Sequence, residues 1–96
     1  MREHDFATFL NGEPSISSDK AVTTRIRHAR KAERIIGIDL DMVVSSDDAT
    51  FEALEKLKST DSRAHAPMQN AVRKYYKFRN GRGFPRMKDY HSPKHP

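Results

Sequence analysis

The sequence predicts an all-α protein, a compact bundle of four to five helices, and three observations lead to this fold class. Apolar residues recur at spacings of three and four, and no segment alternates apolar and polar residues over a strand length. Serine or proline stands where the longer periodic segments begin, and glycine follows three of the four segments. The chain has 96 residues, enough for one modest core. We therefore expect one helical domain over residues 1–81 and a flexible basic tail over residues 82–96.

Two helices are expected in the first part of the chain, over about residues 3–11 and 19–36. Gly12 and Gly37 stand where these helices end, and Ser18 offers an N-cap to the second. The first helix has an apolar face made of Phe6, Phe9 and Leu10. The second has an apolar arc made of Val22, Ile26, Ala29, Ala32 and Ile36. It also has a separate, continuous basic arc made of Arg27, Arg30, Lys31 and Arg34.

The middle of the chain is expected to form a tight connection with one helical turn, followed by a third main helix. The connection should direct four large apolar side chains toward the core: Ile38, Leu40, Met42 and Val43. Ser46, followed by two aspartates, offers an N-cap to a helix over about residues 47–59. This helix turns Phe51, Leu54 and Leu57 inward.

The last helix is expected over about residues 66–79, with Pro67 in its first turn and Gly81 beyond its end. Its apolar arc consists of Met68, Ala71, Val72, Tyr75 and Phe78, and Tyr76 lies at the border. A domain this small needs its aromatic residues for the core, so we interpret this arc as packing rather than base stacking. The opposite arc carries Arg73, Lys74 and Lys77, which are not interleaved with acids as a salt-bridged solvent face would be.

Composition and charge narrow the classes of function. With 35% hydrophobic and 32% charged residues, the chain has no apolar run of transmembrane length. It has no cysteine, and "MREHDFATFL" lacks the features of a secretory signal, so we expect a soluble protein in the cytoplasm. Lysine and arginine number 18 against 13 acids, a net charge of +5 that favours an anionic partner.

The charges are also segregated along the chain. Six basic residues and one acid lie between Lys20 and Arg34, whereas seven acids and two lysines lie between Asp39 and Asp61. If the two basic helices pack through their apolar arcs, their basic arcs can flank one surface that neutralises phosphates. The sequence therefore predicts duplex-DNA binding by nine residues, two of them in the tail: Arg27, Arg30, Lys31, Arg34, Arg73, Lys74, Lys77, Arg82 and Arg86.

The order of these segments resembles a known family. "FATFLNGEPSISSDKAVTTRIRHARKAERIIGIDL", then "TFEALEKLKS" and "MQNAVRKYYKFRNG", are similar to the SAM-like, amino-terminal core-binding domain of tyrosine recombinases and phage integrases. The family's "FL" pair, basic second helix and "YY.F" final helix match residues 9–10, 22–33 and 71–78. The resemblance implies a clamp on duplex DNA, used in recombination by a phage or mobile element, with helices 19–36 and 66–79 facing the DNA.

Enzymatic and metal-dependent functions are not expected. The recombinase catalytic domain does not follow in this sequence, and nothing supplies the arginines and general base that would activate Tyr75, Tyr76 or Tyr90 as a nucleophile. His91 and His95 have a chelating spacing, but Pro93 lies between them. The aspartates after Ile38 lack the spacing of a calcium loop, and no phosphate-binding glycine loop occurs. We expect no cofactor, no metal, no membrane and no small-molecule substrate.

Two other partners remain open. The chain could be a small protein-interaction module, also of mobile-element origin, that docks on and regulates or inhibits an acidic protein, or that associates with itself. A DNA binder should keep residues 39–61 away from its basic face, whereas a self-associating module could pair the two charge blocks between subunits. RNA binding would require Tyr76, Phe84 and Tyr90 to be exposed and free to stack.

Overall fold

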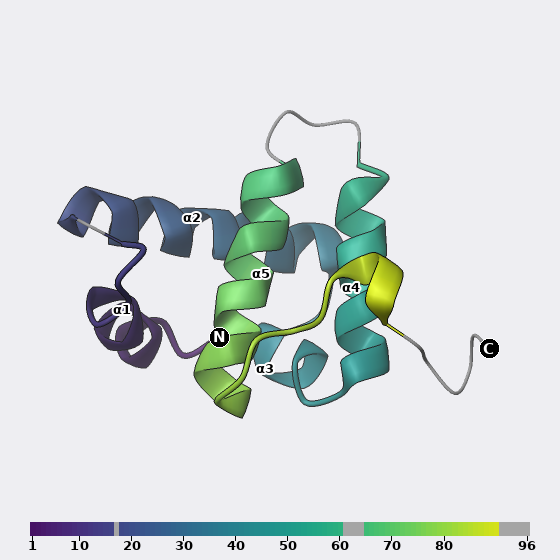
Figure 1. Ribbon diagram of the computed structural model, residues 1–96. Coiled ribbons are helices and arrows are strands. Elements are labelled where there is room, and N and C mark those ends of the chain that lie inside the picture. Colours follow the sequence, from purple (N-terminus) through teal and green to yellow (C-terminus); the bar gives the residue numbers. More distant parts are fainter. Residues whose placement is uncertain (17, 61–64, 91–96) are drawn as a thin grey trace.

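The computed structural model describes residues 1–16, 18–60 and 65–90, and within these ranges the chain is entirely helical, without a strand (Figure 1). Its elements are α1 (Glu3–Asn11), α2 (Asp19–Ile36), α3 (Leu40–Val43), α4 (Asp47–Lys58), α5 (His65–Asn80) and a short 3-10 helix, η1 (Met87–Asp89). The expected compact helical bundle is confirmed. α5 is its central element, because it contacts each of the other four α-helices.

The helix ends follow the capping residues of the sequence. Ser18 Oγ accepts a hydrogen bond from the Ala21 N–H at 3.1 Å, and Ser46 Oγ accepts one from the Ala49 N–H at 3.2 Å. Gly37 ends α2 in the left-handed conformation, at φ 80°, which costs glycine little because it has no Cβ. These three signals fix where α2 and α4 begin and where α2 ends.

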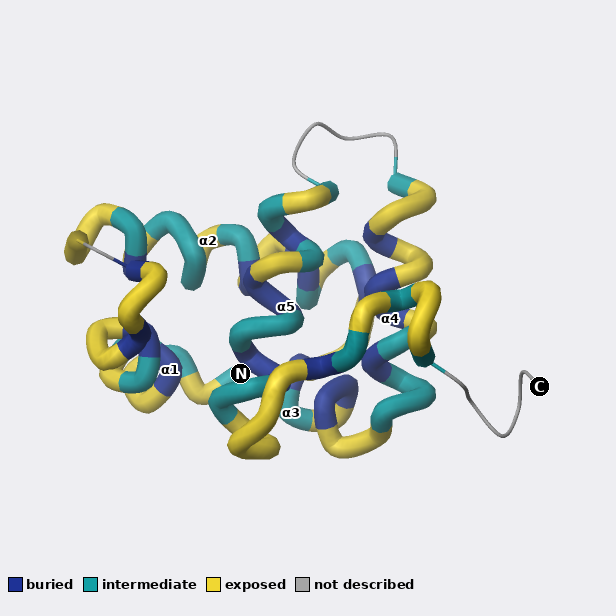
Figure 2. The backbone as a smooth tube through the Cα atoms, in the orientation of Figure 1, coloured by how far each residue is buried: buried dark blue, intermediate teal, exposed yellow. Residues whose placement is uncertain are grey.

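The core lies where α5 meets α2 and α4 (Figure 2). The fully buried residues of α5 are Met68, Ala71, Val72, Tyr75 and Tyr76. The sequence placed Tyr76 at the border of the apolar arc, but the structure buries it completely, so it is a core residue. Phe78 is partly buried, and its ring packs against Phe6 and Phe9 of α1, with centroids 5.7 and 5.5 Å away. The aromatic residues of α5 thus serve packing, as expected.

The segment after α5 differs from the flexible tail that the sequence predicted. Residues 82–90 run from the end of α5 across to α4 (Figure 1). The Phe84 side chain is only 7% exposed and packs edge-on against Tyr76, with ring centroids 5.1 Å apart. Tyr90 stacks on Phe51 of α4 at 5.1 Å. The packed domain therefore extends at least to Tyr90, because two aromatic residues bury apolar surface that the lack of periodicity concealed. Residues 91–96 of the expected tail lie outside the described residues.

The connection between α2 and α4 also differs in part from the expectation. Leu40 and Val43 are buried, but Ile38 and Met42 are 50% and 67% exposed. α3 is a single turn of four residues, so only the two positions three apart can face the core. The other two apolar side chains are directed outward.

Candidate nucleic-acid interface

The side of α2 opposite the core is strongly basic. α2 buries Val22, Ala29, Ala32 and Ile36, and the residues roughly 180° away on the helix are exposed. We call the basic residues of this side the outer face of α2: Lys20, Arg27, Arg30, Lys31 and Arg34. Glu33 borders this face, because it lines a hollow with Glu3, Arg27, Arg30 and Arg34. Its carboxylate accepts a hydrogen bond from the Leu40 N–H at 2.8 Å and lies 3.3 Å from the N-terminal amino group. Lys20 was missed at the sequence level, although its helical angle places it beside Arg27.

Most of the outer face has no internal counter-charge. Arg30 forms an ion pair with Glu3 of α1, which lowers the pKa of the Glu3 carboxyl and raises that of the guanidinium. Lys20, Arg27, Lys31 and Arg34 have no ion-pair partner among the residues that the structure describes. Four cations are thus available to an external anion.

The basic side of α5, by which we mean Arg73, Lys74 and Lys77, has a different environment. Arg73 Nη1 donates hydrogen bonds to the carbonyl oxygens of Phe84 and Pro85, both at 3.1 Å. Its guanidinium lies 5.8 Å from the centroid of the Phe84 ring. Burial lowers the pKa of Arg73. This side chain anchors the segment that follows α5, which is a structural role.

The two lysines of this side share one carboxylate. Glu13, in the loop after α1, is 8% exposed, and its Oε1 lies 3.1 Å from Lys77 Nζ and 3.6 Å from Lys74 Nζ. The hydrogen bond from Lys77, together with the charges of both lysines, lowers the pKa of Glu13 in spite of its burial. Lys74 Nζ also donates to Ser15 Oγ at 3.0 Å. Glu13 therefore offsets part of the positive charge that the sequence placed here.

The two arginines after α5 also have partners within the chain. Arg82 lies 5.4 Å from the centroid of the Tyr76 ring and 3.4 Å from an Asp47 carboxylate oxygen. Arg86 pairs with Asp89 at 3.0 Å on the surface. All five basic residues that the sequence assigned to α5 and the tail are thus engaged internally.

The two predicted basic arcs approach each other near the start of α2 and do not lie side by side along their length. α5 crosses in front of α2, and the two helices meet through their apolar arcs (Figure 1). Most of the outer face of α2 is therefore turned away from α5, but Lys20 lines a hollow with Arg25 and with Asn70 of α5. The link between the two basic arcs is Arg25, a residue not assigned to the site, which lines a hollow of about 270 Å³ with Asn70, Arg73, Lys74 and Lys77.

Three aspartates of the acidic middle of the chain accept hydrogen bonds from tyrosine hydroxyls. Tyr75 Oη donates to Asp41 Oδ1 at 2.5 Å and Tyr76 Oη to Asp47 Oδ1 at 2.6 Å. Tyr90 makes the same kind of contact with Asp48.

These contacts affect the acidity and the exposure of the phenols. Burial, with the nearby aspartate, raises the pKa of Tyr76 to about 12 and that of Tyr75 further. Both phenols are therefore protonated donors at neutral pH. Tyr76 and Phe84 are buried, so they do not meet the exposure that base stacking requires.

Neither a metal site nor a membrane span is found in the described ranges. No group of three or more histidine, aspartate or glutamate side chains there is arranged to hold a metal ion. No described helix has the length and apolar character needed to cross a bilayer. His91 and His95 lie outside the described residues.

Comparison with protein-family models, with curated proteins and with solved structures finds no match for the chain. The functional inference therefore depends on the fold and on the chemistry of the two basic surfaces.

Proposed function

We propose that the chain is a non-enzymatic module that binds duplex DNA by gripping phosphates with the outer face of α2. One observation carries this proposal: five exposed cations share one side of α2, and four of them have no ion-pair partner among the described residues. Isolated solvent-facing helices usually mix the two signs of charge at spacings of three and four. The excess of cations over acids on this side of α2 favours an external polyanion.

The dimensions of the face suit a duplex. From Lys20 to Arg34 the helix rises about 21 Å at 1.5 Å per residue, and duplex DNA carries one charge per 1.7 Å of its axis. Arginine, which supplies three of the five cations, presents a planar fork that matches phosphate oxygens. Because α2 is fixed to the core by Ala29 and Ala32, its backbone loses little entropy on binding.

The resemblance to recombinase core-binding domains supports the same partner. In that family the helix corresponding to α2 faces DNA. A module of this kind would therefore hold the DNA in a cytoplasmic recombination system of a phage or mobile element. We restrict the interface to α2, because the basic residues of α5 contact Glu13 and the tail. Contacts to phosphates alone predict weak preference for sequence.

Fluorescence anisotropy with labelled duplex DNA at several salt concentrations tests the proposal. Four or five phosphate contacts predict a slope of log affinity against log salt of about −4, at about 0.9 per contact. Two unrelated duplexes should bind equally, and single-stranded DNA and RNA more weakly. Polyglutamate of matched length is the control for an acidic protein partner. Undetectable duplex binding at low salt, or tighter binding of polyglutamate, would overturn the proposal.

A further inference from the structure

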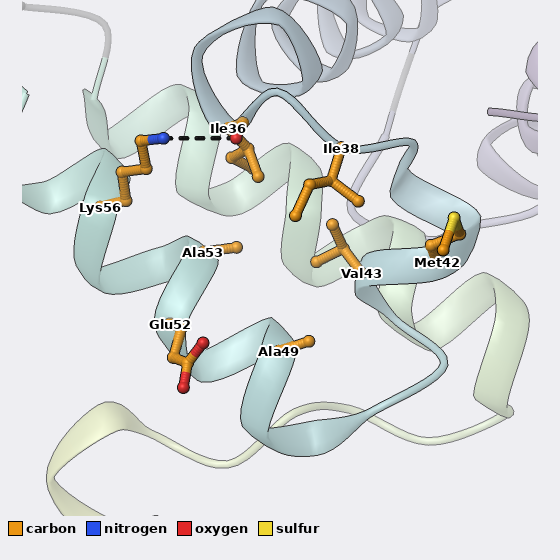
Figure 3. A pocket seen from close by; sticks show the side chains of 8 residues that line it. All are labelled: Ile36, Ile38, Met42, Val43, Ala49, Glu52, Ala53 and Lys56. Atoms are coloured by element: carbon orange, nitrogen blue, oxygen red, sulfur yellow. Dashed lines mark hydrogen bonds between the residues drawn. The ribbon is translucent and has the colours of Figure 1, made fainter.

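The two exposed large hydrophobic side chains of the described residues lie beside the same hollow. These are Ile38, 50% exposed, and Met42, 67% exposed. The hollow has a volume of about 350 Å³ and lies between the end of α2, α3 and α4 (Figure 3). Its apolar lining consists of Ile36, Ile38, Met42, Val43, Ala49 and Ala53. Apolar surface gathered in this way marks an interaction site more often than scattered residues do.

The α4 side of this hollow is shaped for another helix. Ala49 and Ala53 lie one turn apart and point toward the hollow (Figure 3), and such small side chains let a second backbone approach closely. Glu52 and Lys56 border the same side, and Lys56 Nζ donates to the Ile36 carbonyl oxygen at 3.3 Å. The border therefore carries one negative and one positive charge, one helical turn apart.

We propose that this hollow is a homodimer interface, in which α4 packs antiparallel to α4 of a second copy. A two-fold axis between Glu52 and Lys56 places each Glu52 opposite Lys56 of the second copy. The interface then contains two equivalent pairs of opposite charge. The charge pattern is thus complementary to itself. An acidic partner attracted by the net charge of +5 would instead bind the outer face of α2, because the border of the hollow carries one charge of each sign.

Met42 and the hollow also suit a symmetric contact. A two-fold interface needs a protrusion and a recess on the same patch, and Met42 projects from α3 beside the recess (Figure 3). The unbranched thioether adapts to irregular gaps, so Met42 of each copy fills the recess of the other. The patch is small, which predicts a weak dimer with a dissociation constant on the order of 10–100 μM.

Sedimentation velocity on the full chain, free of nucleic acid, tests the dimer. Between about 5 μM and 1 mM, the apparent mass should rise from the 11.0 kDa monomer toward twice that value. Met42→Glu should weaken dimerisation at least a hundredfold and so keep the chain monomeric, because it puts an unpaired charge into an apolar contact. Met42 is exposed, so the variant should retain its helical circular dichroism.

Charge exchange tests the antiparallel pairing itself. Glu52→Lys and Lys56→Glu should each weaken the homodimer about tenfold, because each replaces two opposite-charge pairs by like-charge pairs. A mixture of the two single variants should form a heterodimer, and the double variant E52K/K56E should recover the homodimer. Glu55→Lys is the matched control, since Glu55 lies on α4 but does not line the hollow.

A chain that stays monomeric at 1 mM would overturn this inference and leave the hollow to a different protein. A dimer that survives Met42→Glu, or that the charge exchange does not restore, would place the interface elsewhere and would also overturn it. None of these results depends on DNA binding, so the two proposals fail separately.

Discussion

The outer face of α2 and the basic side of α5 have the same kind of sequence pattern and opposite environments. Both are arcs of lysine and arginine across from an apolar arc. On α2 four of five cations have no ion-pair partner among the described residues, whereas on α5 Arg73 holds two carbonyl oxygens and both lysines contact Glu13. A basic arc in a sequence therefore indicates which side of a helix faces outward, and not whether its charges are available.

The difference arises from the place of each helix in the fold. α5 is the central helix, and its outward side still lies beside the loop after α1 and the segment after α5. These two segments bring a carboxylate and two carbonyl oxygens to its cations. α2 packs against α5, α1 and α4 through its buried side, and within the described ranges Glu3 of α1 is the one acid that forms an ion pair with its outer face.

The largest expected difference between the two faces is in stability. Arg73→Ala should lower the free energy of unfolding by about 2 kcal/mol, because it removes charge-assisted hydrogen bonds to Phe84 and Pro85. Arg27→Ala, the matched control on α2, should change it by less than about 0.5 kcal/mol. Urea denaturation measures both, and amide exchange should show residues 84–90 opening in the Arg73 variant. Equal effects for the two arginines would remove the distinction between the faces.

A smaller stability effect is expected at Glu13, and it should depend on pH. The folded-state pKa of Glu13 lies below its ordinary value of 4.5. Its ion pairs therefore stabilise the fold fully above that value, and the contribution is lost as pH falls through the folded pKa. Glu13→Gln should cost about 1 kcal/mol at pH 7 and progressively less as the pH is lowered toward 3.

Urea denaturation of the wild type and the Glu13 variant at both pH values measures this difference. Glu55→Gln, an exposed residue of α4, is the control. A cost at Glu13 that does not change with pH would mean that the two lysines are not its partners.

Removing the charge of Glu3, which pairs with Arg30, should increase the difference in available charge between the outer face of α2 and the basic side of α5. Glu3→Gln releases Arg30 from its ion pair and should strengthen duplex binding two- to fivefold, with a steeper salt dependence. Asp5→Asn is the control, because it removes the same charge from α1 and Asp5 has no ion pair with the outer face. Anisotropy titration compares the two variants, and the Glu3 variant should gain more affinity than the Asp5 variant.

The smallest expected effect concerns His28, which lies on the flank of α2 between the two faces. Burial, with the positive charges of Arg27, Arg25 and Lys31, lowers the pKa of His28 below its ordinary 6.5. A duplex on the outer face should offset that repulsion and raise the pKa. Nuclear magnetic resonance titration with and without DNA measures the change. A His28 pKa that falls further on binding would contradict a phosphate backbone nearby.

The sequence predicted the helices well because their signals are local. Ser18, Ser46, Gly37 and the apolar periodicity of α5 act within one or two turns, and the structure has those caps and that buried arc. Asp39 also behaves as a local cap, since its carboxylate accepts the Asp41 N–H at 2.8 Å.

The features that the sequence did not reveal depend on contacts between distant residues. Phe84 is ordered by Tyr76 and Arg73, and the pairing of Glu13 with Lys77 joins residues 64 positions apart. The exposure of Met42 depends on how short α3 is. For the same reason, the pattern could not tell that the basic arcs of α2 and α5 point to different sides.

The most direct test of the difference between the two faces is a matched pair of double variants in one DNA titration. Arg27→Ala with Arg34→Ala, and Lys74→Ala with Lys77→Ala, each remove two positive charges. We expect the α2 pair to weaken duplex binding about tenfold or more and to flatten the salt slope by about two, at 0.9 per contact. The α5 pair should change the slope by less than one. An equal or larger loss for the α5 pair, in proteins with intact helical content, would contradict the assignment of the interface to α2.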